Sequence, residues 1–183
     1  MNMEKYDYWQ WANVIDNNQI KEINSICEKY QEPSFKDNNA EDVVKTANIK
    51  GIRWEFLKSS LHYVNEMWRT QNKFSFGFNI FESFDIDLWN INIYDSKNEG
   101  EYKFHFDASH DNINDVKLTG IVNISDEPYE GGEFIIYENE EILGIKNPGS
   151  SLLLKHGILH KVNPVTKGKR KTLSFWFHGP RFI

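Results

Sequence analysis

The chain has 183 residues, of which 39% are hydrophobic and 15% aromatic, so it can form one globular domain with a substantial core over 1–183. Its single cysteine, Cys27, excludes an intrachain disulfide and offers no cysteine cluster for a metal, which favours a reducing compartment. No stretch approaches the ~18 apolar residues of a membrane span, and the N-terminus lacks the apolar run of a signal peptide. We therefore expect a cytoplasmic protein that does not enter a membrane.

The formal net charge of −6 is distributed unevenly. No acidic residue follows Glu141, whereas eight lysines and arginines do, so residues 142–183 carry +8. The preceding residues hold the other 13 basic side chains and all 27 acidic ones, a balance of −14. A basic end can steer an anionic small molecule or nucleic acid, or it can be a solvated surface with no ligand. Charge alone leaves both interpretations open.

Two segments near the N-terminus have helical periodicity. Asp16 and Gln19 resemble a capping box, which predicts a helix over 17–30. Within 52–70 an apolar stripe recurs at helical spacing and predicts a second helix that covers one sheet; its members are Trp54, Leu57, Leu61, Val64 and Trp68. His62 lies off that stripe, so we do not expect it to contact a metal. We expect 31–50 to be a polar loop with a short helical piece, and 1–72 to be mainly helical support.

From residue 73 onward the pattern changes to short strands. Phe74, Phe76 and Phe78 alternate with other residues, and within 88–95 apolar and polar side chains alternate, so that a polar row can line a pocket. Further strands are expected at 102–108, 118–125, 132–137, 141–146, 150–155, 158–163 and 170–178. Helices followed by many short strands favour an α+β fold with a double-stranded β-helix (jelly roll, cupin-like) core over 73–183 and N-terminal supporting helices.

The segment 102–107 alternates aromatic and polar residues with period two. On a strand, Lys103, His105 and Asp107 would share one face, and the opposite face would pack through its aromatic rings, namely Tyr102, Phe104 and Phe106. An imidazole and a carboxylate side by side provide two of the three ligands of a 2-His-1-carboxylate site, which holds non-haem Fe(II) and leaves positions open. This segment therefore predicts part of an iron site.

The third ligand must come from a distant part of the chain. The remaining candidates are His110, His156, His160 and His178. His160 is favoured because it lies where a turn at Gly157 enters a strand before Pro164, near the end of the expected barrel. His156 is the second choice.

Arg170 follows His160 by ten residues. If 158–163 and 170–178 form an antiparallel pair, Arg170 lies at the start of the strand beside the metal ligand and shares a face with Thr172, Ser174 and Trp176. A guanidinium can bind a carboxylate through two parallel hydrogen bonds. Arg170 thus suits the distal carboxylate of a dicarboxylic acid whose near end chelates iron; an exposed basic residue is the alternative.

Three motifs together carry a family resemblance. His105-x-Asp107, the run Glu130–Phe134, and the run 159–170 with Trp176 downstream are similar to the Fe(II)- and 2-oxoglutarate-dependent oxygenases of the prolyl 4-hydroxylase type. The likeness is strongest to the bacterial and phage PKHD-type branch and covers about residues 88–180.

This resemblance implies specific roles. It makes His105, Asp107 and His160 the catalytic iron ligands and Arg170 the partner of the 2-oxoglutarate C5 carboxylate. Tyr94 would contact the same carboxylate, and Tyr102 corresponds to a family tyrosine three residues before the first histidine. Thr172 and Trp176 would line the cosubstrate channel. For Tyr94, Thr172 and Trp176 ordinary packing is the alternative, and the Gly131-Gly132 pair is expected to start a bulged strand.

The implied activity is hydroxylation of a C–H bond, coupled to decarboxylation of 2-oxoglutarate to succinate. It requires Fe(II), 2-oxoglutarate as cosubstrate and O2, with ascorbate as a possible reductant. A prolyl or other amino-acid residue in a peptide or protein is the expected substrate, covered by loops 95–101 and 108–117; the polar, acidic segment 109–115 disfavours nucleic acid. The alternatives are a small molecule or nucleobase as substrate, a cupin-type metal enzyme, or a non-catalytic binding module without 2-oxoglutarate. The oligomeric state is not predicted.

Overall fold

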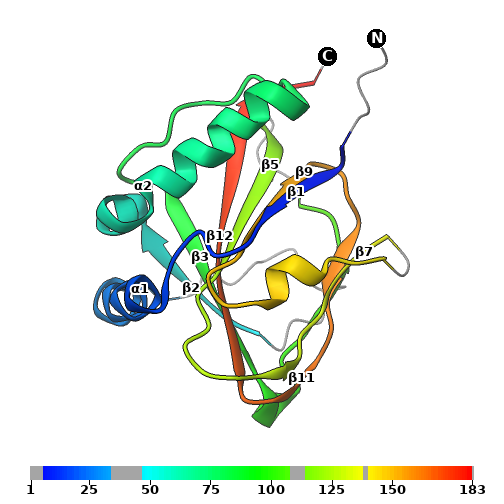
Figure 1. The fold of residues 1–183 in the computed structure, drawn as a ribbon. Coiled ribbons are helices and arrows are strands. Elements are labelled where there is room, and N and C mark those ends of the chain that lie inside the picture. Colours follow the sequence, from blue (N-terminus) through cyan, green and yellow to red (C-terminus); the bar gives the residue numbers. More distant parts are fainter. Residues whose placement is uncertain (1–5, 34–46, 108–113, 138–139, 183) are drawn as a thin grey trace.

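The computed structural model describes residues 6–33, 47–107, 114–137 and 140–182. Two antiparallel sheets face each other, and both long helices lie on one side of the larger sheet (Figure 1). The strand order is β1-β9-β5-β12-β3-β2 in the six-stranded sheet and β4-β10-β7-β8 in the four-stranded sheet, and β11 pairs with β6. This double-sheet arrangement with supporting helices confirms the predicted α+β, jelly-roll-like fold.

The helices and strands have the following bounds. The long helices are α1 (Asn17–Tyr30) and α2 (Trp54–Gln71), and three short helical turns are η1 (Asn72–Phe76), η2 (Ser96–Asn98) and η3 (Leu143–Lys146). The strands are β1 (Tyr8–Trp11), β2 (Asn48–Arg53), β3 (Leu88–Asp95), β4 (Tyr102–His105), β5 (Asn114–Asn123), β6 (Glu130–Gly131), β7 (Phe134–Ile136), β8 (Glu140–Glu141), β9 (Ser151–Lys155), β10 (His160–Val162), β11 (Val165–Lys167) and β12 (Lys169–Pro180).

Both long helices form where the sequence predicts them. The Asp16 side chain accepts hydrogen bonds from the backbone of Asn18 and Gln19, and the Gln19 side chain accepts one from the Asp16 backbone, which completes the capping box of α1. The predicted stripe of α2 is buried against the outer face of the six-stranded sheet. Trp68 lies directly over Gly120 of β5, where a Cβ would be 2.4 Å from the indole ring. Glycine at this position therefore lets the helix approach the sheet.

A second apolar core fills the space between the two sheets. It is formed by inward-facing side chains of both sheets and of η3, among them Tyr94, Ile121, Phe134, Ile136, Leu154 and Val162. In contrast, no helix among the described residues covers the outer face of the four-stranded sheet. Phe104 and Phe106, which we expected to be packed, are 37% and 56% exposed for this reason. That part of the prediction is wrong, whereas Tyr102 does pack against the inner core.

Two predicted strands are short helical turns instead. The alternating residues after Asn72 continue α2 as the π-helical turn η1, because the Asn72 side chain bonds to both backbone groups of Phe78 and Gly77 ends the turn at φ +71°. Most of the predicted strand 141–146 is η3. Its buried residues, Ile142 and Ile145, are three apart while Leu143 is 67% exposed, which is the spacing of a 3₁₀-helix.

The sheets also contain pairings that the sequence did not predict. β1 and β2, from the supposedly helical N-terminal part, form the two edges of the six-stranded sheet. The expected pairing of 158–163 with 170–178 is wrong: β10 pairs with β4 and β7, whereas β12 pairs with β3 and β5. His160 and Arg170 therefore belong to opposing sheets.

Ion pairs offset the uneven charge of the sequence. Lysines of the basic C-terminal segment bind carboxylates from earlier in the chain, in the pairs Lys146–Glu133, Lys167–Glu130, Lys169–Asp95 and Lys171–Asp126. The fold thus brings opposite charges together, so that these four lysines are neutralised within the chain. No helix in the described part of the chain is long and apolar enough to cross a membrane.

Candidate metal centre

Three side chains from two neighbouring strands converge at one end of the barrel. His105 ends β4, Asp107 follows it by two residues, and His160 begins β10 directly opposite His105. One ligand atom from each lies within 4.8 Å of the others. His105 Nε2 is 3.9 Å from Asp107 Oδ1, and His160 Nε2 is 3.6 Å from Asp107 Oδ2. Ligand bonds of about 2.0–2.2 Å allow donors of one ion to be at most about 4.4 Å apart, so both distances fit a shared metal.

The backbone fixes which nitrogen each histidine presents. His105 Nδ1 is 2.8 Å from the carbonyl oxygen of Lys103, and His160 Nδ1 is 2.8 Å from that of Ile158. A carbonyl oxygen only accepts hydrogen bonds, so each Nδ1 carries a proton and donates it. In the neutral tautomer that donates through Nδ1, Nε2 is the atom that can ligate a metal, and both Nε2 atoms lie toward Asp107.

Aromatic rings hold the two imidazoles in place. The ring of Tyr102 stacks on His105 at a centroid distance of 3.6 Å, and that of Phe134 stacks on His160 at 5.2 Å. His160 is buried and His105 is mostly covered. The ring of Tyr102, which was predicted as a cofactor-binding residue, lies beside a histidine of the cluster, and its cofactor role stays a prediction.

Thr119 is a site residue that the sequence analysis did not select. Its Oγ1 donates a 2.6 Å hydrogen bond to Asp107 Oδ2 from β5 of the opposite sheet. The alternation of β5 contains the signal, because Thr119 and Asn123 are polar positions on the face that carries Ile121. The sequence predicted a strand over 118–125, without a site role for its polar positions.

Arg170 lies in the interior of the same barrel, and none of the carboxylates that the structure describes forms an ion pair with it. Its side chain is only 1% exposed, and its Cζ is 5.3 Å from the ring centroid of Tyr94, its partner on β3. Within the described part of the chain, neither Nε nor Nη2 of Arg170 has a hydrogen-bond partner. Buried guanidinium nitrogens without hydrogen-bond partners are costly. Arg170 is therefore suited to an anionic ligand such as a carboxylate.

The glycine pair before β7 makes room for this arginine. Gly131 and Gly132 have φ of +77° and +67°, as expected at an irregular strand start. A Cβ on Gly132 would be 2.9 Å from both Arg170 Cδ and Val165 Cγ2. The glycine therefore forms part of the space that holds the arginine side chain.

The other predicted cofactor residues face the barrel interior beside Arg170. Thr172 is buried and accepts a 3.3 Å hydrogen bond from Asn92 of the polar row on β3. Trp176 is half-buried and is the β12 partner of Thr119. Tyr94 is buried in the inner core. Their positions are compatible with a lined channel, and their roles stay predictions.

The remaining histidines and one predicted loop lie apart from the cluster. His110 lies outside the described residues, as does most of loop 108–117, and His62 is exposed on α2. His156 packs against Phe78 and Phe182, where burial, followed by Lys155 and Lys117, lowers its pKa. His178 lies on β12 and is not part of the metal-binding group found in the described residues.

Loop 95–101, which was expected to cover the substrate beside His105 and Asp107, contacts the segment before β12. The backbone of Ser96 donates to Gly168, and that of Val165 donates to Gly100. The loop thus precedes β4 and contacts the turn before β12, whereas His105 and Asp107 lie at the other end of β4.

Fold and donor set together define a class of protein: a double-sheet barrel with two histidines and one carboxylate at its mouth, the donor set typical of non-haem iron oxygenases. Comparisons with known proteins agree. Residues 89–178 match the family model of the 2OG-Fe(II) oxygenase superfamily. A PKHD-type hydroxylase of Pseudomonas aeruginosa is 36% identical over 85 residues, which is 42% of this chain and 38% of that protein. The chain thus spans about two fifths of the length of the curated relatives it matches.

Solved structures show the same fold over nearly the whole chain. The 2OG complex of a viral collagen prolyl hydroxylase from Paramecium Bursaria Chlorella virus-1 has a TM-score of 0.70 at 13% identity and covers 95% of this chain and 97% of its own. A Trichoplax adhaerens prolyl hydroxylase, in complex with a hypoxia inducible factor oxygen degradation domain peptide fragment, has a TM-score of 0.65 at 15% identity and covers 93% and 83%. The family model thus places a 2OG-Fe(II) oxygenase domain over residues 89–178, and the solved structures show that the chain has the fold of prolyl 4-hydroxylases.

Proposed function

We propose that this chain is one oxygenase domain over 1–183 that hydroxylates a prolyl or other amino-acid residue of a peptide or protein, using Fe(II), O2 and 2-oxoglutarate. In this proposal His105, Asp107 and His160 bind the iron, and Arg170 binds the distal carboxylate of 2-oxoglutarate. One observation carries it: a donor cluster that could hold a metal and a buried guanidinium, two of whose nitrogens have no hydrogen-bond partner among the described residues, belong to the same barrel. A ligand that chelates the metal through two atoms and also carries a distal carboxylate would occupy open metal positions and pair with the Arg170 guanidinium.

When bound, iron and 2-oxoglutarate supply oxidative decarboxylation to succinate and CO2, coupled to hydroxylation of a C–H bond. The protein side chains bind and orient. The Nδ1–carbonyl bonds direct both Nε2 atoms at the metal position, and Thr119 holds one oxygen of Asp107. The rings of Tyr102 and Phe134 shield the imidazoles from water.

Residues beside Arg170 would complete the cosubstrate site. Tyr94 is the β3 partner of Arg170, and Thr172 lies two residues further along β12, where Asn92 bonds to it. We assign Tyr94 a contact to the 2-oxoglutarate carboxylate, and Thr172 and Trp176 the wall of the channel. Ascorbate would serve as an external reductant.

The substrate class is supported by the relatives. Similar curated proteins are PKHD-type hydroxylases, and one similar structure holds a peptide fragment. A peptide or protein substrate in the cytoplasm is therefore proposed ahead of a small molecule or nucleobase. A cupin-type enzyme without 2-oxoglutarate gives no role to the buried Arg170 guanidinium, so we place it second.

The assignment is tested by spectroscopy under anaerobic conditions. Adding Fe(II) and 2-oxoglutarate should give a weak visible charge-transfer band that is lost in His160→Ala. His62→Ala, which changes an exposed histidine of α2, is the matched control and should keep the band. Folded wild-type protein without a band would overturn the proposal. Succinate release, screened against peptides, free amino acids and nucleosides, then identifies the substrate.

A further inference from the structure

A polar layer crosses the barrel interior beside Arg170. Asn92 of β3 and Thr172 of β12 are cross-strand partners, and Ser174 lies two residues further along β12. All three side chains are buried, with exposed fractions of 6%, 1% and 7%. Leu173 belongs to the core under the helices, so the alternation of the strand directs Thr172 and Ser174 into the barrel. We call Asn92, Thr172 and Ser174 the Asn92 layer.

One amide group serves both hydroxyls of this layer. Asn92 Nδ2 donates a 3.0 Å hydrogen bond to Ser174 Oγ and a 3.3 Å hydrogen bond to Thr172 Oγ1. An amide nitrogen carries two protons, so these two bonds use both of them. Each hydroxyl then accepts through a lone pair, and its own proton is left for a different partner. Within the described part of the chain, neither hydroxyl donates a hydrogen bond.

The unused donors of the Asn92 layer face the same interior as those of Arg170. Nε and Nη2 of Arg170 also have no hydrogen-bond partner among the described residues. Thr172 and Arg170 are two residues apart on one face of β12, which is about 7 Å along a strand. Buried donors without acceptors cost free energy. A ligand group that only accepts hydrogen bonds, such as a carboxylate, therefore fits beside these donors, whereas a carboxamide would add further donors.

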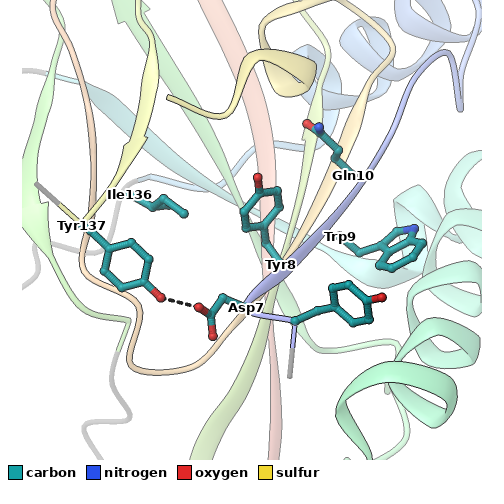
Figure 2. A pocket seen from close by; sticks show the side chains of 7 residues that line it. Asp7, Tyr8, Trp9, Gln10, Ile136 and Tyr137 are labelled. Carbon is teal, nitrogen blue, oxygen red and sulfur yellow. Dashed lines mark hydrogen bonds between the residues drawn. The ribbon is translucent and has the colours of Figure 1, made fainter. Parts of the chain in front are cut away.

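A cleft at the edge of the barrel has different chemistry. It has a volume of about 530 Å³, lies between β1 and the end of β7, and has Asp7 as its only charged lining residue. Figure 2 shows the Tyr137 hydroxyl directed at this carboxylate, to which it donates a hydrogen bond. The proton of that hydroxyl is thus already used, and the lining offers an anion no cation. An anionic ligand is therefore expected beside the Asn92 layer and not in this cleft.

We propose that Asn92 is a positioning residue for the cosubstrate, which fixes the hydroxyls of Thr172 and Ser174 as hydrogen-bond donors toward the carboxylate end that Arg170 binds. This inference rests on the proposed function for the identity of the cosubstrate as 2-oxoglutarate. Without the Asn92 amide, each hydroxyl can rotate and accept a hydrogen bond from the ligand. Asn92 thus acts on the ligand through the two hydroxyls and favours a carboxylate over a carboxamide.

The test measures ligand binding to the Mn(II)-loaded protein, so that it does not depend on turnover. Asn92→Ala should bind 2-oxoglutarate at least fivefold more weakly than wild type, with unchanged Mn(II) affinity. Asn92→Val, whose branched side chain suits a strand, serves if the alanine variant does not fold. Tryptophan fluorescence quenching measures each affinity.

Two control variants should bind 2-oxoglutarate as wild type does. Asn90→Ala changes an asparagine on the same face of β3, opposite Ser174, whose side chain makes no hydrogen bond within the described structure. Tyr137→Phe removes a hydroxyl from the cleft of Figure 2 and leaves the Asn92 layer intact.

A pair of ligands separates positioning from a structural role. N-oxalylglycine is a 2-oxoglutarate analogue with N–H in place of one methylene, and N-oxalylglycinamide is its carboxamide. Wild type should bind the carboxamide at least tenfold more weakly than the acid. In Asn92→Ala this ratio should fall at least threefold, because the released hydroxyls can accept from the amide. A merely structural role of Asn92 would weaken both ligands alike and leave the ratio unchanged.

Three results would overturn the positioning proposal: equal 2-oxoglutarate affinity in Asn92→Ala and wild type, an equal loss in Asn90→Ala, or an unchanged ratio for the two analogues. In a Thr172→Val/Ser174→Ala background, Asn92→Ala should cost less than a further twofold, and a full further loss would contradict action through the hydroxyls. If wild type shows the iron–2-oxoglutarate band and Asn92→Ala binds normally, this proposal fails while the oxygenase assignment stands. Wild type that binds no 2-oxoglutarate contradicts both.

Discussion

The hydroxyl of Thr119 donates a 2.6 Å hydrogen bond to Oδ2 of Asp107 and thereby joins the two sheets at the candidate metal centre. Thr119 belongs to β5 of the six-stranded sheet, whereas Asp107 follows β4 of the four-stranded sheet. Hydrogen bonds to a ligating carboxylate orient it and tune metal affinity. The relative position of the sheets is thus coupled to the orientation of one metal ligand.

Thr119→Val should weaken metal binding about 10- to 100-fold, because the carboxylate loses the donor that orients it. The measurement is calorimetric titration of the protein with Mn(II), which does not require turnover. Thr119→Ser keeps the hydroxyl and should restore most of the affinity. Equal Mn(II) affinity in the valine variant and wild type would show that Thr119 has no positioning role.

Arg170→Met should abolish the increase in melting temperature that 2-oxoglutarate and Mn(II) together produce in wild type. Truncating one partner of a buried charge pair costs about 2–5 kcal/mol of binding. Without ligand, the variant should melt no lower than wild type, because it removes buried polar nitrogens that lack partners in the described structure. Thermal melts with and without 2-oxoglutarate measure both effects, and a retained 2-oxoglutarate shift contradicts the assigned role.

Gly132→Ala should weaken 2-oxoglutarate binding while metal affinity stays unchanged. The added Cβ would be 2.9 Å from Arg170 Cδ, and φ of +67° adds strain of about 1–2 kcal/mol. Gly77→Ala is the matched control, since Gly77 has φ of +71° but no atom within 4 Å of the added Cβ. Quenching of tryptophan fluorescence by 2-oxoglutarate in the presence of Mn(II) measures the 2-oxoglutarate affinity of both variants. Equal weakening in both variants would assign the effect to backbone strain alone.

Alkaline pH should destabilise the fold through Cys27. Burial raises the pKa of its thiol to about 12 from the ordinary 9.0, with Lys171 opposing and Glu28 adding to the shift. Because the folded pKa is raised, this contribution to stability is complete below pH 9 and is lost toward pH 12, by up to about 1.4 kcal/mol per pH unit. Urea denaturation at pH 8 and pH 10.5 measures the loss. Cys27→Ala should reduce the difference, and an identical difference would exclude the thiol as its source.

The sequence predicts elements best where one local rule acts without competition. The capping box and apolar spacing predict α1 with its observed bounds, and strict alternation predicts β3. The residues after Asn72 also alternate, yet the Asn72 side chain bonds to Phe78 and continues the helix. The edge strand β2 is not predicted because its polar residues and Gly51 resemble a loop. It forms only because β3 offers it a partner.

The candidate site is predicted in composition but not in architecture. Period-two spacing and the turn before His160 select all three residues of the cluster. However, the sequence does not reveal that His160 and Arg170 lie in opposing sheets, because strand pairing is a long-range property. Thr119 is not predicted for the same reason, because its role at the site depends on a hydrogen bond to Asp107 that crosses between the two sheets.

The two Nδ1–carbonyl bonds have a consequence for metal identity. They fix the orientation of both imidazoles before a metal binds, so a divalent ion need not reorient them. For a site of nitrogen and oxygen ligands, the Irving–Williams order predicts tighter binding of copper, nickel and zinc than of ferrous iron. Aerobically purified protein should therefore carry contaminating zinc or nickel. Under the proposed role, the availability of iron in the cell, rather than the metal selectivity of the three ligands, determines that iron occupies the site.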